Sequence, residues 1–174
     1  RFSISYLIRI KIPDTSKFLL VRGHRIKDQL QPVGGVYKKL NGFSEFENWG
    51  YKEDCGAKGM KSDDISKDDL RFRVKGKYAL DVIKWFESRK DRETTYEREF
   101  NEELIEDHGF DKDIFYSKSF REVQKTMKVF GYSTFHQCYE VLIYDIVEFL
   151  PTSEQEVELK NLLKNPRKLG NHFM

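Results

Sequence analysis

The chain has 174 residues, with 31 Lys or Arg against 29 Asp or Glu, so its formal net charge is only +2. A chain of this length can bury a full hydrophobic core, and we expect a single domain over residues 1–174. The balanced charge argues against a general nucleic-acid coat and against a polybasic membrane binder. Any binding site must therefore be local, and no polymeric nucleic acid is expected as a partner.

The first segment predicts a β-hairpin. Apolar side chains occupy every second position over residues 2–12, which is the period of a strand with one buried face. Pro13–Ser16 is a cluster of turn residues, and residues 17–22 continue as a second strand. A polar loop then leads to Gly34 and Gly35, two adjacent glycines that allow the backbone to approach another group closely.

Residues 38–77 are polar, glycine-rich and irregular, and we expect them to be an insertion. Within them Leu70–Val74 alternates as a short strand, and its arginines suit the edge of a sheet. The rings of Phe46, Trp49 and Tyr51 are expected to pin the insertion to the core, with stacking on bases as the alternative.

Two helices are predicted in the middle of the chain. Residues 80–88 carry apolar side chains at helical spacing. A second helix, over Thr95–His108, starts after a capping-box spacing at Thr94–Glu97 and ends before Gly109, which is placed as a C-terminal cap. Phe100 is expected on its buried side.

The second helix carries a concentrated acidic run. Arg98–Glu103 reads Arg-Glu-Phe-Asn-Glu-Glu, and Glu99, Glu102 and Glu103 fall on one side of the helix. Like charges at this spacing oppose the helix unless open solvent or a bound cation offsets them. Mg²⁺ is the natural candidate because it prefers oxygen ligands and is usually held by one or two carboxylates plus phosphate oxygens. A solvated acidic face is the alternative.

The last third of the chain predicts strands and a closing helix. Residues 117–129 and 132–149 are rich in strand-forming side chains, with a turn expected at Phe130–Gly131. Pro151–Glu154 is a helix-start signal before a final apolar periodic segment. Together the elements indicate a mixed sheet with helices packed against it, which is an α/β fold.

No stretch reaches the length of a transmembrane helix, since the longest apolar run, Val141–Leu150, contains two carboxylates. Cys55 and Cys138 form no Cys-x-x-Cys pair, so neither a disulfide framework nor a structural zinc site is expected, and a reducing, cytosolic setting is the default. The first residue is Arg1 rather than Met, which leaves open an upstream targeting or membrane segment.

Gly34–Gly35 followed by Arg98–Glu103 resembles the Nudix box, whose usual form is Gly-x5-Glu-x7-Arg-Glu-apolar-x-Glu-Glu-x-Gly-apolar. The second half of the box is intact. Its opening glycine lies about fifty residues further from the Arg than in the usual form. Lys90 occupies the position of the first glutamate, and Ile105 that of the later glycine.

The split box, the opening strand Phe2–Ser5 and the segment Gln31–Tyr37 are similar to the SMODS-associated Nudix domain over nearly all of the chain. The resemblance implies a Nudix-like α/β/α sandwich on a mixed sheet, with residues 38–77 as the insertion that splits the box. In that family the domain is found beside cyclic-oligonucleotide synthases of bacterial anti-phage systems (CBASS), commonly behind N-terminal membrane helices. The resemblance therefore implies a cytosolic domain of an inner-membrane bacterial protein, attached through an upstream segment absent from this chain. A homo-oligomer is left open.

In working Nudix hydrolases the carboxylates of this motif hold a divalent metal on a substrate diphosphate and help to activate water. The resemblance implies that Glu99, Glu102 and Glu103 bind Mg²⁺, or Mn²⁺ as its substitute, and that they are catalytic if the domain is active. Arg98 would orient one of them by a charge-assisted hydrogen bond. Lys90 puts a cation where the motif has an anion, which favours phosphate binding without turnover.

Residues around the glycines are candidate ligand contacts, with Arg suited to phosphate, Tyr to base stacking and Gln to a base edge. For each of them taken alone, a solvated loop residue is the alternative. The helix over Thr95–His108 is expected to line a cleft opposite the glycines. The full set of candidate ligand contacts is Arg22, His24, Arg25, Gln31, Gly34, Gly35, Tyr37 and Arg98.

Two functions stay open from the sequence. The first is a sensor domain that binds a cyclic oligonucleotide second messenger in a CBASS effector. The alternative is a Mg²⁺-dependent Nudix hydrolase of a nucleoside diphosphate derivative. A protein-interaction scaffold with a vestigial box is a third interpretation. The sequence leaves the nucleobases and their linkage undefined.

Overall fold

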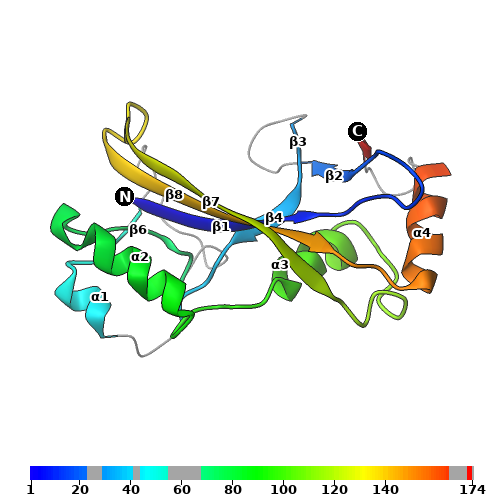
Figure 1. The fold of residues 1–174 in the computed structure, drawn as a ribbon, viewed down its shortest axis with the longest axis horizontal. Coiled ribbons are helices and arrows are strands. Elements are labelled where there is room, and N and C mark those ends of the chain that lie inside the picture. Colours follow the sequence, from blue (N-terminus) through cyan, green and yellow to red (C-terminus); the bar gives the residue numbers. More distant parts are fainter. Residues whose placement is uncertain (23–28, 41–43, 55–67, 165–171, 174) are drawn as a thin grey trace. The chain divides into compact units, whose positions relative to one another are not determined.

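The computed structural model describes residues 1–22, 29–40, 44–54, 68–164 and 172–173, with the side chains of residues 125–129 and 172–173 excepted. Figure 1 shows the chain as a ribbon. The elements in chain order are β1 (Phe2–Arg9), β2 (Leu19–Arg22), β3 (Leu30–Gln31), β4 (Val33–Val36), α1 (Glu45–Asn48), β5 (Lys52–Glu53), β6 (Arg71–Arg73), η1 (Gly76–Tyr78), α2 (Ala79–Ser88), α3 (Glu97–Phe100), η2 (Asn101–Glu106), β7 (Phe120–Ser133), β8 (Cys138–Phe149), α4 (Ser153–Lys164) and β9 (His172–Phe173).

The larger sheet has the strand order β5-β6-β1-β8-β7, with β4 also pairing with β1, and a smaller sheet has the order β3-β2-β9. β6 runs antiparallel to β1. β8 runs parallel to β1, because the nitrogen of Arg1 donates to the carbonyl oxygen of Tyr139 while the carbonyl oxygen of Arg1 accepts from the N–H of Val141. The sheet is therefore mixed and carries helices, which confirms the predicted α/β class.

Contacts divide the chain into two compact units. The first comprises Arg1–Ser5, Val36–Thr94 and Thr126–Tyr144, and the second comprises Tyr6–Gly35, Thr95–Lys125 and Asp145–Met174. β1, β7 and β8 contribute residues to both units. The expectation of a single domain stays a prediction.

The opening strand follows its predicted period. Its six even-numbered apolar side chains are all buried. The turn at Pro13–Ser16 is also as predicted, since the N–H of Leu19 donates to the carbonyl oxygen of Ile10 at 2.9 Å and Lys11 pairs with Phe18. This hairpin belongs to the second unit and leads directly into β2.

The core of the first unit is aromatic. The ring of Phe46 contacts the rings of Trp49, Tyr51 and Trp85 at centroid distances of 5.7, 5.1 and 5.0 Å. Phe46 and Trp49 are only 7% and 6% exposed. Aromatic pairs of this kind stabilise a core beyond the area that they bury. The prediction that these rings pin residues 38–77 to the core is confirmed for the described part of that segment.

The core of the second unit centres on Phe100, which is fully buried and packs against Phe149, Phe115 and Phe120. Leu104, one helical turn further on, is also fully buried. The predicted buried side of the acidic helix is therefore confirmed. Its burial fixes the rotation of the helix and with it the direction of the carboxylates.

Three local predictions are wrong. β6 lies between β5 and β1 rather than at an edge, because Lys52 and Glu53 pair with it on its outer side. The hairpin turn lies at Thr134–Gln137 rather than Phe130–Gly131, and Phe130 adopts a positive φ within the strand. No side-chain cap begins the acidic helix, whose N-cap residue is Tyr96.

Candidate functional site

The helix that carries the Arg-Glu-x-x-Glu-Glu motif changes its winding inside the motif. It begins as α3 at Glu97 and continues as the π-helical segment η2 over Asn101–Glu106. The N–H of Asp107 donates to the carbonyl oxygen of Glu102 at 3.1 Å, five residues back. π-Helical turns are rare and are frequently found at functional sites. The motif is thus on a helix, as predicted, but not on an unbroken α-helix over Thr95–His108.

Arg98 links two of the three motif carboxylates. Its Nη1 lies 2.7 Å from Oε1 of Glu99 and 3.0 Å from Oε2 of Glu102. One guanidinium therefore offsets the charge of two carboxylates and fixes their orientation. The expected orienting role of Arg98 agrees with this geometry.

The third carboxylate points to the glycines. The backbone N–H of Gly34 donates to Oε2 of Glu103 at 2.9 Å. Burial raises the pKa of Glu103 to about 7. The Gly34 N–H opposes that rise, whereas the nearby charges of Glu99, then Asp107 and Glu102, add to it. A cation beside this carboxyl group would favour its charged form.

Both glycines lie close to carboxylates of the acidic helix, as the motif predicted, while the insertion that would split the box stays a prediction. A Cβ on Gly35 would overlap the carboxyl group of Glu99. A Cβ on Gly34, whose φ is +148°, would overlap the backbone carbonyl oxygen of Tyr6. Gly34 therefore needs a residue without a side chain, whereas a side chain at position 35 requires the end of Glu99 to move. The cleft expected between helix and glycines stays a prediction.

The structure places some candidate ligand residues near one another and leaves others apart. Arg22 and Gln31 lie on adjacent paired strands, since Arg22 pairs with Leu30 and Val21 with Gln31. Arg22 is exposed. His24 and Arg25 lie outside the described residues.

Tyr37 requires a correction. Its side chain is only 1% exposed, and the centroid of its ring lies 5.5 Å from that of Phe86. The guanidinium of Arg92 lies over the Tyr37 ring, 5.0 Å from the ring centroid. A ring held in this way is part of the core of the first unit. The expectation that Tyr37 stacks on a base is therefore wrong for this structure.

The carboxylates fit a hard divalent cation by their chemistry, because Mg²⁺ prefers oxygen ligands. Among the described residues, no three His, Cys, Asp or Glu side chains converge as they would around a metal ion. Mg²⁺ commonly takes one or two carboxylates and completes its shell with water and phosphate oxygens. Glu99, Glu102 and Glu103 therefore suit a cation that arrives with a phosphate ligand better than one held in a preformed cage.

His108 also takes part in the motif segment, although it was not among the predicted site residues. Its Nδ1 lies within hydrogen-bond distance of the carbonyl oxygen of Glu103. The two residues are five apart, a separation that the π-helical segment brings together and that ordinary helical spacing does not. No pattern in the sequence predicted the π-helical segment.

A mixed α/β fold that brings a Gly-Gly strand against an Arg-Glu-x-x-Glu-Glu helix defines a Nudix-type domain. The family model described as SMODS-associated NUDIX domain matches residues 1–173, and the chain belongs to this family. Comparison with the curated proteins gave no match, and neither did comparison with the solved structures. Among the described residues, no helix is both long enough and apolar enough to cross a membrane.

Proposed function

We propose that this domain is the sensor of a bacterial anti-phage (CBASS) effector and binds a cyclic oligonucleotide second messenger without consuming it. Family membership supports the link, because a SMODS-associated domain implies cyclic-oligonucleotide signalling. A cyclic phosphodiester lacks the diphosphate that Nudix chemistry attacks. The domain would then use the Nudix fold for recognition alone.

The observation that carries this proposal is the pairing of the motif carboxylates within the chain. Glu99 and Glu102 are held by Arg98, and Glu103 accepts from the Gly34 N–H. The guanidinium of Arg98 offsets part of the negative charge with which Glu99 and Glu102 would attract a metal ion. Lys90, in place of the first glutamate of the box, also makes metal binding less favourable, because it puts a positive charge where the motif has a negative one.

The finer architecture belongs to the same proposal. The domain would be a Nudix-like α/β/α sandwich whose box is split by residues 38–77. In the complete protein it would lie in the bacterial cytosol, attached to the inner membrane by an upstream segment. Arg22, His24 and Arg25 would bind phosphate, and Gln31 would bind a base edge.

One observation favours the alternative, a Mg²⁺-dependent hydrolase of a nucleoside diphosphate derivative. A buried carboxyl group with a pKa of about 7, as at Glu103, is suited to general-base catalysis at neutral pH. A bound divalent metal would supply charge neutralisation of the phosphates and activation of water. Glu99, Glu102 and Glu103 would hold it.

A thermal-shift screen of cyclic di- and trinucleotides tests the proposal. A ligand that binds only the folded state stabilises it by RT ln(1 + [L]/Kd), about 2.7 kcal/mol at a hundredfold excess over Kd, which such an assay detects. Arg22→Ala should reduce the shift. Arg121→Ala is the matched control, because Arg121 is an exposed arginine on β7 that pairs with Glu148. Equal loss in both variants, or no shift with any cyclic nucleotide, would contradict the proposal.

A further inference from the structure

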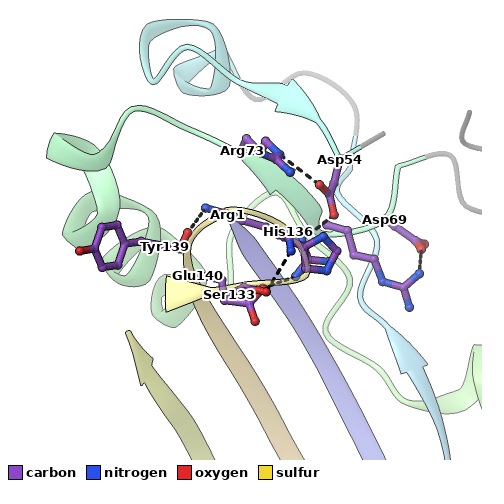
Figure 2. A network of polar contacts seen from close by, with 9 residues as sticks. Arg1, Asp54, Asp69, Arg73, Ser133, His136, Tyr139 and Glu140 are labelled. Carbon is purple, nitrogen blue, oxygen red and sulfur yellow. Dashed lines mark hydrogen bonds and ion pairs between the residues drawn. The ribbon is translucent and has the colours of Figure 1, made fainter. Parts of the chain in front are cut away.

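The first unit contains a polar cluster that the proposed function does not use. Figure 2 shows it at the turn of the β7–β8 hairpin, where side chains from several elements converge on Arg1 and His136. Nε of Arg1 lies 2.6 Å from Oδ2 of Asp54, and its Nη1 lies 3.1 Å from Oε2 of Glu140. The guanidinium of Arg1 therefore ties residue 54, which follows β5, to strand β8.

The ion pair between Arg1 and Asp54 is withdrawn from water. The side chains of Arg1 and Asp54 are 8% and 3% exposed. Asp54 also accepts from Nε of Arg73 at 3.2 Å. Burial alone would raise the pKa of Asp54, but the hydrogen bonds and charges of Arg1 and then Arg73 bring that pKa below its ordinary value. Asp54 therefore stays ionised in mildly acidic solution, and its ion pairs persist there.

His136 is the member of the cluster that can change its charge near neutral pH. It lies in the turn Thr134–Gln137, and its backbone N–H donates to Oγ of Ser133 at 3.2 Å. Its Nδ1 is buried and has no hydrogen-bond partner. A proton added at this nitrogen would be an unsatisfied buried donor, which is costly in a low-dielectric setting.

We propose that this cluster is an acid-sensitive latch, in which a proton on His136 releases the turn of the β7–β8 hairpin from Arg1 and Asp54. The charged groups that face His136 are Arg1 of β1, Arg73 of β6, Asp54 after β5 and Glu140 of β8. Asp54 and Glu140 are already paired with the arginines, so their attraction for an added positive charge on His136 is offset by repulsion from Arg1 and Arg73.

The electrostatics give the direction of the response. Burial, and after it the charge of Arg1, lowers the pKa of His136 below its ordinary value, against the opposing effect of Asp54 and Glu140. The released state therefore binds the proton more readily than the latched state. The latch is fully stable above the ordinary histidine value of about 6.5 and weakens as the pH falls toward the lowered value.

Hydrogen exchange of the domain at pH 7.5 and pH 5.5, corrected for intrinsic exchange rates, tests the latch. Amides of residues 133–137 should lose protection severalfold at the lower pH in the wild type. His136→Gln, which cannot titrate, should remove that loss. His172→Gln is the matched control and should respond as the wild type does, because His172 lies in β9 in the other unit.

Asp54→Asn weakens the ion pairs of the latch independently of pH. It should lower the protection of the turn amides against hydrogen exchange at both pH values. An NMR titration gives an independent readout that does not depend on any variant. It should place the pKa of His136 below that of a free histidine. An unshifted His136, or a pH response that survives in His136→Gln, would overturn the latch.

Discussion

Glu103 combines burial with a single backbone donor, and its titration links the site to stability. Its pKa is raised to about 7 in the folded state. The stabilisation that this group gives is therefore complete below its unfolded value and is lost as the pH rises through 7. At neutral and higher pH the folded protein carries the cost of a buried, ionised carboxylate.

Glu103→Gln should therefore stabilise the protein at pH 8, by an amount on the order of 2 kcal/mol, and should have little effect at pH 5. The amide oxygen of Gln can still accept from the Gly34 N–H. Urea denaturation at the two pH values measures the difference. Glu106→Gln is the control, since Glu106 is exposed on the same segment. An effect of equal size at both pH values would contradict the raised pKa of Glu103.

The two glycines should respond differently to the same substitution. Gly34→Ala meets a backbone carbonyl and an unfavourable φ, neither of which can move aside, so we expect a loss of about 2–4 kcal/mol in the free energy of unfolding. Gly35→Ala meets the end of the Glu99 side chain, which can rotate away, so we expect a loss below about 1 kcal/mol with Glu99 displaced from Arg98.

Gly131→Ala is the control for both glycines, because a Cβ there meets nothing within 4 Å. Chemical denaturation gives the stabilities, and a structure of the Gly35→Ala variant shows the position of Glu99. If both site variants cost as little as the Gly131 variant, the close approach of β4 to the acidic helix is not as described.

At the scale of the elements, helix α4 begins where the sequence predicted, and the side chain of Gln155 in its first turn is buried, which the sequence did not predict. The N–H of Thr152 donates to Oε1 of Gln155, and Oγ1 of Thr152 accepts from the N–H of Gln155. This is a capping box. Gln155 is 1% exposed, and its Nε2 also donates to the carbonyl oxygens of Ile114 and Ser117.

Thr152→Ala should cost about 1 kcal/mol, the usual value of a lost N-cap. Gln155→Ala should cost more, on the order of 2–4 kcal/mol, because it removes a buried side chain and also leaves the carbonyl oxygens of Ile114 and Ser117 without this donor. Thermal and urea unfolding of the two variants check the order. The reverse order would show that Gln155 contributes to the cap alone.

Helices and strands could be predicted from the sequence where the hydrophobic period or the helix-start signal depends on neighbouring residues. The alternation of β1, the start of α4 and the C-terminal Gly109, whose φ is +65°, depend on a few neighbouring residues. The position of β6 inside the sheet depends on pairing with the distant Lys52–Glu53, which no local pattern of arginines reports.

The site was predictable to the same extent. The meeting of Gly34–Gly35 with Glu99 and Glu103 followed from the motif, since both halves must form one site. The burial of Tyr37 did not follow, because it arises from packing against Phe86 and Arg92, far along the chain. The π-helical turn at Asn101–Glu106 did not follow either, because no pattern in the sequence distinguishes it from an α-helix.

At the scale of the whole molecule, the protein is a Nudix-type domain of the SMODS-associated family whose motif carboxylates have partners within the chain. In the proposed function this domain binds an anionic ligand while Glu99 and Glu102 pair with Arg98 and Glu103 accepts from the Gly34 N–H. Such a domain should separate binding from turnover, and this separation can be measured in one experiment.

Equilibrium dialysis against a cyclic oligonucleotide in the presence of Mg²⁺, followed by chromatography of the recovered ligand, is the most direct measurement. The account predicts saturable binding with the ligand recovered intact, while a linear nucleoside diphosphate derivative in a parallel cell is also left uncleaved. Mg²⁺-dependent cleavage of the linear compound, lost in Glu102→Gln/Glu103→Gln, together with no binding of any cyclic nucleotide, would contradict it and favour the hydrolase.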